Sequence, residues 1–212
     1  MNPARDLTIF NTTTFWMVAG IFLLSAWSQF SVWQHLVLFL RDEGFRPTAA
    51  AYLFSLFLAA STVGRFVGGP LSDKISADYA MLLSIALTGF SVVGLLSARS
   101  PAVIYLGVVL LGLGEGGTVT GRPLLVFEHY GSTGVGKLYG VATALMTCGA
   151  FVGPVLAGYI HDQTRSYNSA FLLALILVCI SIVLVILLKR ANTSLLAPVP
   201  GELSASNIGN AG

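Results

Sequence analysis

The stretch Gly64-Arg65-Phe66-Val67-Gly68-Gly69-Pro70-Leu71-Ser72-Asp73-Lys74 closes a long apolar segment and has a counterpart later in the chain. The counterpart is GPVLAGYIHD, residues 153–162. Two glycines and an aspartate have the same spacing in both stretches, at an offset of 89 residues: Gly64 and Gly153, Gly69 and Gly158, Asp73 and Asp162. The chain therefore reads as two copies of one unit, although glycines are common in apolar helices and chance is the alternative explanation.

The composition places most of the chain in lipid. Residues of the AVILMFWYC set make up 55% of its 212 residues and charged residues only 9%, whereas a soluble domain carries about 25% charged residues. The mean hydropathy is +0.82. A nucleic-acid binder is excluded because the net charge is only +2 and the 11 Lys and Arg are scattered. A disulfide scaffold is excluded because both cysteines lie in apolar runs.

Six apolar runs are long enough to cross a bilayer, which takes about 20 residues. They are too long and too apolar for the strands of an outer-membrane barrel. We predict a cytoplasmic N-terminal segment at 1–14, a six-helix transmembrane bundle at 15–190 and a disordered C-terminal tail at 191–212. The predicted spans are 15–40, 48–71, 79–98, 102–127, 138–160 and 169–188.

The offset of 89 residues divides these spans evenly. It carries the first span onto the fourth, the second onto the fifth and the third onto the sixth. Because each copy has an odd number of spans, the second copy must be upside down in the membrane. Inverted three-helix repeats of this kind occur within each half of some secondary transporters. The predicted fold is therefore an all-α membrane protein of two inverted three-helix repeats.

Residues 64–74 resemble the loop signature G-x-L-x-D-[RK] of the major facilitator superfamily. Further residues are similar to the C-terminal half of its monocarboxylate transporter and oxalate/formate antiporter group: His35-Leu36-Val37, Asp42-Glu43-Gly44, Gly116-Gly117, Pro123, Tyr130-Gly131, Tyr139-Gly140, Gly153-Pro154, Gly158, Asp162, Tyr167 and Phe171. The resemblance covers about residues 10–190. It implies half of a twelve-span carrier, matching helices seven to twelve, and a small organic anion as substrate.

Two positions depart from the pattern of that group. Ser76-Ala77-Asp78 stands where the family often has Gly-Arg-[RK]. Ser61 stands four residues before the arginine, where the monocarboxylate branch has an acidic residue. The second departure puts proton coupling through such a pair in doubt.

Arg65 is the first candidate substrate-binding residue. It lies eight residues before Asp73, which is roughly 12 Å along a helix, and a charge at that depth is costly unless it faces protein or water. A guanidinium can hold a carboxylate through two parallel hydrogen bonds. The resemblance matches Arg65 to the family's eighth-helix arginine and implies a role in anion binding. The alternative is a structural arginine that snorkels or pairs with another helix.

Glu115, Arg122 and His35 complete the predicted substrate-binding set. Glu115 and Arg122 are seven residues apart, so two helical turns bring them to one face, where both can line a cavity. Glu115 can carry a coupling proton or belong to a fixed ion pair, and Arg122 is expected near the cytoplasmic end beside Glu128. His35 can contact substrate or respond to pH; a buried neutral histidine bonded to a backbone carbonyl is the alternative.

The glycines and the loop charges suggest packing and gating roles. Gly69, Asp73 and Lys74 are expected to form a cytoplasmic gate, as the resemblance implies, although an isolated Asp-Lys pair is also an ordinary solvated turn. Small residues four apart permit close helix crossings. The predicted packing residues are Gly64, Gly68, Gly149, Gly153, Pro154 and Gly158.

These observations favour a secondary active transporter that moves small organic anions by alternating access, with a proton as the candidate coupling ion. Because one bundle cannot do this alone, we expect a second six-helix half or a homodimer partner, or a chain that is a fragment. A non-transporting membrane scaffold or receptor, or an inactive half-transporter, is the alternative. No enzyme motif is present in the sequence, and we expect neither a cofactor nor a metal site. The Lys and Arg distribution, five against four, leans only slightly toward an arrangement with both termini cytoplasmic. We expect the protein in the cell membrane.

Overall fold

The computed structural model describes residues 12–97, 100–131 and 135–195. Within these ranges it contains six helices, each long and apolar enough to cross a membrane, which confirms the predicted number of spans. Their bounds are α2 Thr13–Asp42, α3 Pro47–Ile75, α4 Ala77–Ser97, α5 Pro101–Tyr130, α6 Val135–Thr164 and α7 Asn168–Leu195. The last helix continues through Leu195, beyond the predicted end of the bundle at residue 190.

The helix ends follow from local sequence. Pro47 and Pro101 open α3 and α5, where a missing N–H costs nothing. Among the described residues other than glycine, positive φ occurs at Ser76, which ends α3 (φ 88°), and at Arg165, which follows α6 (φ 56°). These two residues are separated by the repeat offset of 89, so a residue with positive φ follows the equivalent helix of each copy.

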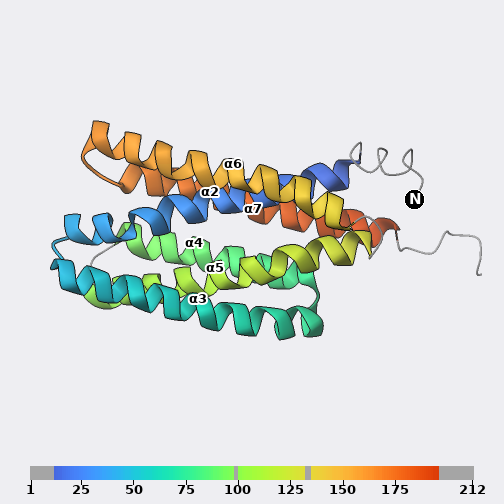
Figure 1. The fold of residues 1–212 in the computed structure, drawn as a ribbon, viewed down its shortest axis with the longest axis horizontal. Coiled ribbons are helices and arrows are strands. Elements are labelled where there is room, and N and C mark those ends of the chain that lie inside the picture. Colours follow the sequence, from blue (N-terminus) through green and yellow to red (C-terminus); the bar gives the residue numbers. More distant parts are fainter. Residues whose placement is uncertain (1–11, 98–99, 132–134, 196–212) are drawn as a thin grey trace, which may run out of the picture.

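The helices form two groups that mix the repeats. Helix α2 packs against α6 and α7, while α5 packs against α3 and α4 (Figure 1). The first helix of each three-helix copy therefore packs mainly against the second and third helices of the other copy. This exchange explains why the copies form one bundle rather than two separate three-helix units.

Equivalent glycines make equivalent contacts in the two copies. A Cβ added at Gly64 would lie 2.5 Å from the carbonyl oxygen of Leu113 and 3.2 Å from Cα of Gly116, both on α5. A Cβ added at Gly153 would lie 2.6 Å from the carbonyl oxygen of Trp27 on α2. Trp27 and Gly116 are themselves 89 residues apart. The crossing of α6 with α2 is therefore the equivalent, in the other copy, of the crossing of α3 with α5.

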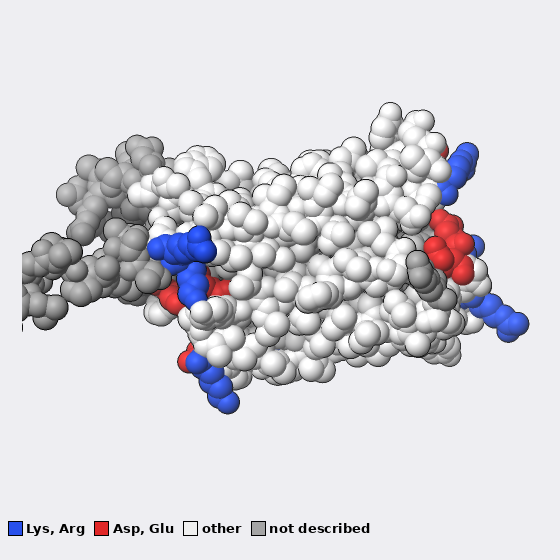
Figure 2. All heavy atoms as spheres, turned by 180° about the vertical axis from the view of Figure 1, so that it is seen from behind, with Lys and Arg blue, Asp and Glu red and all other residues white. Residues whose placement is uncertain are grey.

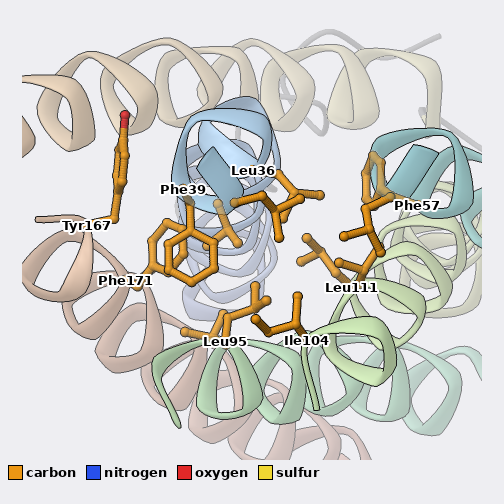
Figure 3. Packing of buried hydrophobic residues seen from close by; sticks show 14 of the residues in the cluster. Leu36, Phe39, Phe57, Leu95, Ile104, Leu111, Tyr167 and Phe171 are labelled. Atoms are coloured by element: carbon orange, nitrogen blue, oxygen red, sulfur yellow. The ribbon is translucent and has the colours of Figure 1, made fainter. Parts of the chain in front are cut away.

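Two clusters of buried apolar residues fill the bundle. One lies around Leu36, Phe39 and Phe171 (Figure 3), and the other around Phe22, Met81 and Leu125. In a bilayer the lipid tails are as apolar as these side chains, so close van der Waals packing, rather than exclusion of water, holds such helices together.

The outer surface is apolar over most of its length. Large side chains such as Phe66, Phe90 and Phe151 are exposed, as expected for surfaces that face lipid or another membrane protein. On the face drawn in Figure 2, Lys, Arg, Asp and Glu side chains gather at the two ends of the bundle and leave a wide uncharged band between them.

Candidate functional site

Arg65 of α3 and Glu115 of α5 form an ion pair near the middle of the bundle. The distance from Arg65 Nη2 to Glu115 Oε2 is 3.5 Å. The hydroxyl of Ser61, one turn before Arg65 on α3, donates a short hydrogen bond to the same carboxylate oxygen. One carboxylate oxygen thus holds both a cation and a hydroxyl from the neighbouring helix.

The two members of this pair differ in exposure. The Arg65 side chain is 53% exposed, whereas that of Glu115 is 13% exposed. The Nη2 contact is a single one at the long end of the hydrogen-bonding range. The guanidinium therefore keeps most of its five N–H donors available to a ligand, while the carboxylate lies against the bundle.

Glycines on α5 make this arrangement possible. A Cβ at Gly116 would overlap the carbonyl oxygen of Ser61, and a Cβ at Gly112 would lie 2.5 Å from the carbonyl oxygen of Phe57. Because both residues lack side chains, α5 approaches α3 at backbone distance. That close approach brings the Ser61 hydroxyl to the Glu115 carboxylate.

Arg122 lies in a different environment from Arg65. It is 4% exposed, and its Nη2 donates to Gln29 Oε1 at 3.0 Å and to Ser25 Oγ at 3.5 Å, both on α2. The sequence places Arg122 beside Glu128 near the end of the helix; the structure instead turns it inward. Glu128 Oε2 accepts a hydrogen bond from the backbone N–H of Ala77, at 2.5 Å.

Gln29 is the centre of this buried polar network, and it is not among the residues predicted from the sequence. Its amide nitrogen donates to Thr88 Oγ1 of α4 at 3.2 Å, and its amide oxygen accepts from Thr118 Oγ1 of α5 at 3.1 Å. The network joins α2, α4 and α5 inside the bundle. A signal was present in the sequence, because Gln29 and Thr118 are polar residues in apolar runs at the offset of 89.

His35 is not brought to the Arg65 pair. Its Nδ1 lies 3.1 Å from the carbonyl oxygen of Ser31 one turn earlier, which assigns the proton to Nδ1. The centre of its ring lies 5.3 Å from that of Tyr167, a residue of the connection between α6 and α7. Its Nε2 faces Gly158 of α6, where an added Cβ would lie 3.5 Å away. These contacts correspond to the backbone-bonded histidine that the sequence left open as an alternative.

The predicted gate residues lie at the end of the bundle where α3 meets α4. Asp73 and Lys74 are exposed in the last turn of α3, and the Cβ position of Gly69 meets open space. Beyond the turn, Asp78 is buried and its carboxylate oxygen lies 2.9 Å from His129 Nε2 of α5. The departure from the family's basic loop therefore places an acidic residue in an internal contact.

The predicted packing glycines lie at helix crossings. Gly69 of α3 differs from them because an added Cβ there would meet open space. Added Cβ atoms at Gly68 and Gly149 would overlap Thr120 and Leu23 respectively, and one at Gly158 would lie 3.5 Å from His35 Nε2. Pro154, next to Gly153, is inside α6 and partly buried. No group of three or more His, Cys, Asp or Glu that could hold a metal ion occurs in the described part of the chain.

Comparison with known proteins identifies the protein family to which this six-helix bundle belongs. The chain matches the model of the Major Facilitator Superfamily over residues 7–207, and it belongs to that family. It is therefore a multi-pass membrane protein of a transporter superfamily, with half of the family's fold.

Within this superfamily, the chain is similar to monocarboxylate transporters in sequence and to a peptide transporter in fold. The chain is 32% identical to monocarboxylate transporter 13 of Bos taurus over 66% of its own length and 33% of the relative's. It is 25% identical to monocarboxylate transporter 10 of Mus musculus over 80% of its length and 34% of the relative's. A solved POT family peptide transporter, auto-inhibited, shares the fold with a TM-score of 0.70 at 16% identity, over 84% of this chain and 37% of that one. The chain thus spans about a third of the length of the relatives it matches.

Proposed function

We propose that the chain is one half of a secondary carrier for small organic anions and that Arg65 is its anion-binding group. The observation that carries this proposal is a guanidinium near the middle of a membrane-spanning helix, 53% exposed and held on one side only by Glu115. Such a charge is costly in lipid. It is accommodated where the exposed side faces a water-filled cavity or a second half of the carrier.

The chemistry of the site favours a carboxylate as ligand. A guanidinium remains charged at all physiological pH values and offers planar pairs of donors that match a carboxylate. Monocarboxylate transporters are among the relatives of the chain, which supports the same class of substrate. Glu115 holds Arg65 through one long contact, so an incoming carboxylate can compete for the guanidinium. The mostly buried Glu115 then loses its cation and keeps the hydrogen bond from Ser61.

Glu115 is the proposed carrier of a coupling proton. The charged or polar groups that face it are Arg65 and Ser61 of α3, with Arg122 two turns along its own helix. A proton on Glu115 removes its attraction for Arg65 and leaves the cation to the substrate. Ser61 replaces the acidic residue expected on α3, and Glu115 supplies a carboxylate to the same arginine from α5 instead.

Alternating access requires a second bundle, which we propose to be another six-helix half or a second copy of this chain. The exposed, charged side of α3 around Arg65 would then face the cavity between the halves. We further propose that the protein lies in the cell membrane with both termini cytoplasmic, and that Gly69, Asp73 and Lys74 act at the cytoplasmic gate.

Arg65→Lys tests the substrate role. This variant keeps the charge but loses the two-pronged geometry, so binding of labelled lactate and oxalate should weaken by about 1.5–3 kcal/mol, or about tenfold to more than a hundredfold. Arg46→Lys, at the exposed start of the same helix, is the matched control and should bind as the parent does. The measurement is tracer binding to correctly folded protein, with its second half co-expressed if one exists. A folded Arg65→Lys protein with parental affinity would exclude the substrate role and favour a structural arginine.

A further inference from the structure

An apolar groove runs along the outside of the bundle between α3 and α4. Its wider part is a hollow of about 600 Å³ lined by Ile75, Tyr79, Leu82, Leu83 and Ala86. A deeper hollow of about 140 Å³ continues from it, lined by Gly64, Val67, Gly68, Leu71, Leu83, Ser84, Leu87, Leu113 and Gly117. Leu83 lines both hollows, so they lie side by side along α3 and α4 and we treat them together as one groove.

The floor of the groove has no unsatisfied polar side chain. Three glycines, Gly64, Gly68 and Gly117, make the deep part hollow because they carry no side chains. Ser84 is buried there and donates its hydroxyl hydrogen bond to the carbonyl oxygen of Ala80 within α4. The groove therefore offers an apolar ligand a smooth surface and offers a polar one no partner along its length.

The length of the groove corresponds to one leaflet of a bilayer. Along α3 it extends from Gly64 to Ile75, which is about 16 Å at 1.5 Å per residue. Half of a hydrocarbon core of about 30 Å is about 15 Å. An acyl chain that enters at the α3–α4 turn therefore reaches the far end of the groove near the middle of the membrane.

The mouth of the groove carries an aromatic ring and a cation. The ammonium of Lys189, near the end of α7, lies 3.2 Å from the centre of the Tyr79 ring, and Tyr79 lines the wide hollow. Lys74 is exposed in the last turn of α3 at the same end, next to the exposed Asp73. Tyrosine is enriched at the membrane–water interface, so this ring marks the level at which lipid headgroups lie.

We propose that this groove binds one anionic phospholipid, with an acyl chain along α3 and α4 and its phosphate at Lys189. The acyl chain accounts for an apolar, leaflet-long groove, and the ammonium fixed over Tyr79 accounts for the selection of a negative headgroup. The lipid site and the anion site use different charged groups, Lys189 of α7 and Arg65 of α3. The deep end of the groove, lined by Gly64, Leu113 and Gly117, lies beside the Arg65–Glu115 pair but contains neither residue.

Native mass spectrometry of the purified full chain with phosphatidylglycerol and phosphatidylcholine of equal acyl length tests this site. One lysine near a membrane surface contributes about fivefold to the binding of an anionic lipid, so phosphatidylglycerol should bind about fivefold more tightly. Lys189→Gln should remove this preference and Lys189→Arg should keep it. Arg190→Gln, which removes an equal charge from the next exposed position, should also keep it.

Filling the groove tests the acyl-chain part of the proposal. Leu83→Trp should weaken the binding of both lipids several-fold, whereas Leu172→Trp, the same change at an exposed site of α7, should not. Equal binding of the two lipids by the parent, an unchanged preference in Lys189→Gln, or parental binding by Leu83→Trp would overturn the proposal. If Leu83→Trp instead changes the mass of the assembly, the groove is an interface between copies and the lipid site is wrong. Thermal unfolding in detergent confirms that each variant is folded.

Discussion

Thr118 donates a hydrogen bond to Gln29, at 3.1 Å between Oγ1 and Oε1, and the two residues occupy equivalent positions in the two repeats. A residue that touches its own equivalent must lie beside the axis that exchanges the copies. The contact therefore locates this pseudo-twofold axis between α2 and α5. Arg122 and Thr88, which also bond to Gln29, lie close to the same axis.

Substitutions at Gln29 and Arg122 should show strong coupling. Gln29→Leu removes the amide that accepts from Arg122 and leaves a buried guanidinium with less support, so it should destabilise the bundle more than Arg122→Met does. The double variant should be less destabilised than the sum of the two single changes, with a coupling energy of about 0.5–3 kcal/mol. The measurement is a double-mutant cycle by equilibrium unfolding in mixed micelles. Additive effects would show that the Arg122–Gln29 contact contributes nothing.

Two glycines of α3 should respond oppositely to alanine. Gly64→Ala places a Cβ 2.5 Å from a backbone oxygen of α5, and such overpacking costs about 1–3 kcal/mol. Gly69→Ala meets open space, so it should be neutral or stabilise α3 by up to about 1 kcal/mol, because alanine is the better helix former. Thermal unfolding of the two variants beside the parent gives the comparison. Similar melting temperatures for both would contradict the close α3–α5 crossing.

Gly153→Leu should disrupt the bundle more than Leu177→Ala does. The first change puts a branched side chain where the backbone of α6 meets that of α2. The second trims a partly buried side chain of α7. Yield and thermal stability in detergent measure the difference, and equal values would argue against the crossing of α2 and α6.

The phenol of Tyr167 should lose its proton at a higher pH than an ordinary tyrosine does. Burial raises the pKa of Tyr167, and the carboxylates of Asp42 and Asp162 raise it further. A raised pKa means that the folded state holds this proton more tightly than the unfolded state does. The stabilisation is complete below the ordinary tyrosine pKa of about 10 and is lost as the pH rises through the folded-state pKa.

The difference spectrum at 295 nm between the parent and Tyr167→Phe isolates this phenol. Its midpoint should lie above 10, and Asp42→Asn should move it back toward 10 by removing one of the two charges. His161 stacks on the ring at 4.1 Å and contacts Asp42 at 3.0 Å, so the Asp42→Asn protein should first be shown to be folded. A midpoint at or below 10 in the parent would contradict the described surroundings of Tyr167.

Cysteine labelling tests the proposed orientation of the chain. Asp73 and Asp162 are exposed at opposite ends of the bundle. In a background in which the exposed Cys148 and Cys179 are replaced by alanine, Asp162→Cys should react with an impermeant reagent in intact cells. Asp73→Cys should react only after permeabilisation. The reverse pattern would place both termini outside.

The bundle was predictable because lipid makes span length and apolar composition strict requirements, and the 89-residue offset was visible in the glycines. The partners of the buried charges were not predictable in the same way. Glu115 and Arg122 share a face of α5, as their spacing indicates, but neighbouring helices cross at an angle. That face therefore meets α3 beside Glu115 and α2 beside Arg122. Sequence spacing fixes the direction of a side chain, whereas the identity of its partner depends on which helix lies at that height.

The exposure of Arg65 also has a consequence for the biosynthesis of the protein. A chain released into the bilayer before its complement arrives presents a charge near the middle of a helix to lipid, at a cost of about 2.5–3.5 kcal/mol. Assembly with a partner that hydrates or covers this side of α3 removes the cost. We therefore expect the solitary bundle to be short-lived in cells. Its abundance should rise when the proposed complementary half is co-expressed, so that the exposed Arg65 would mark a bundle that has not yet assembled.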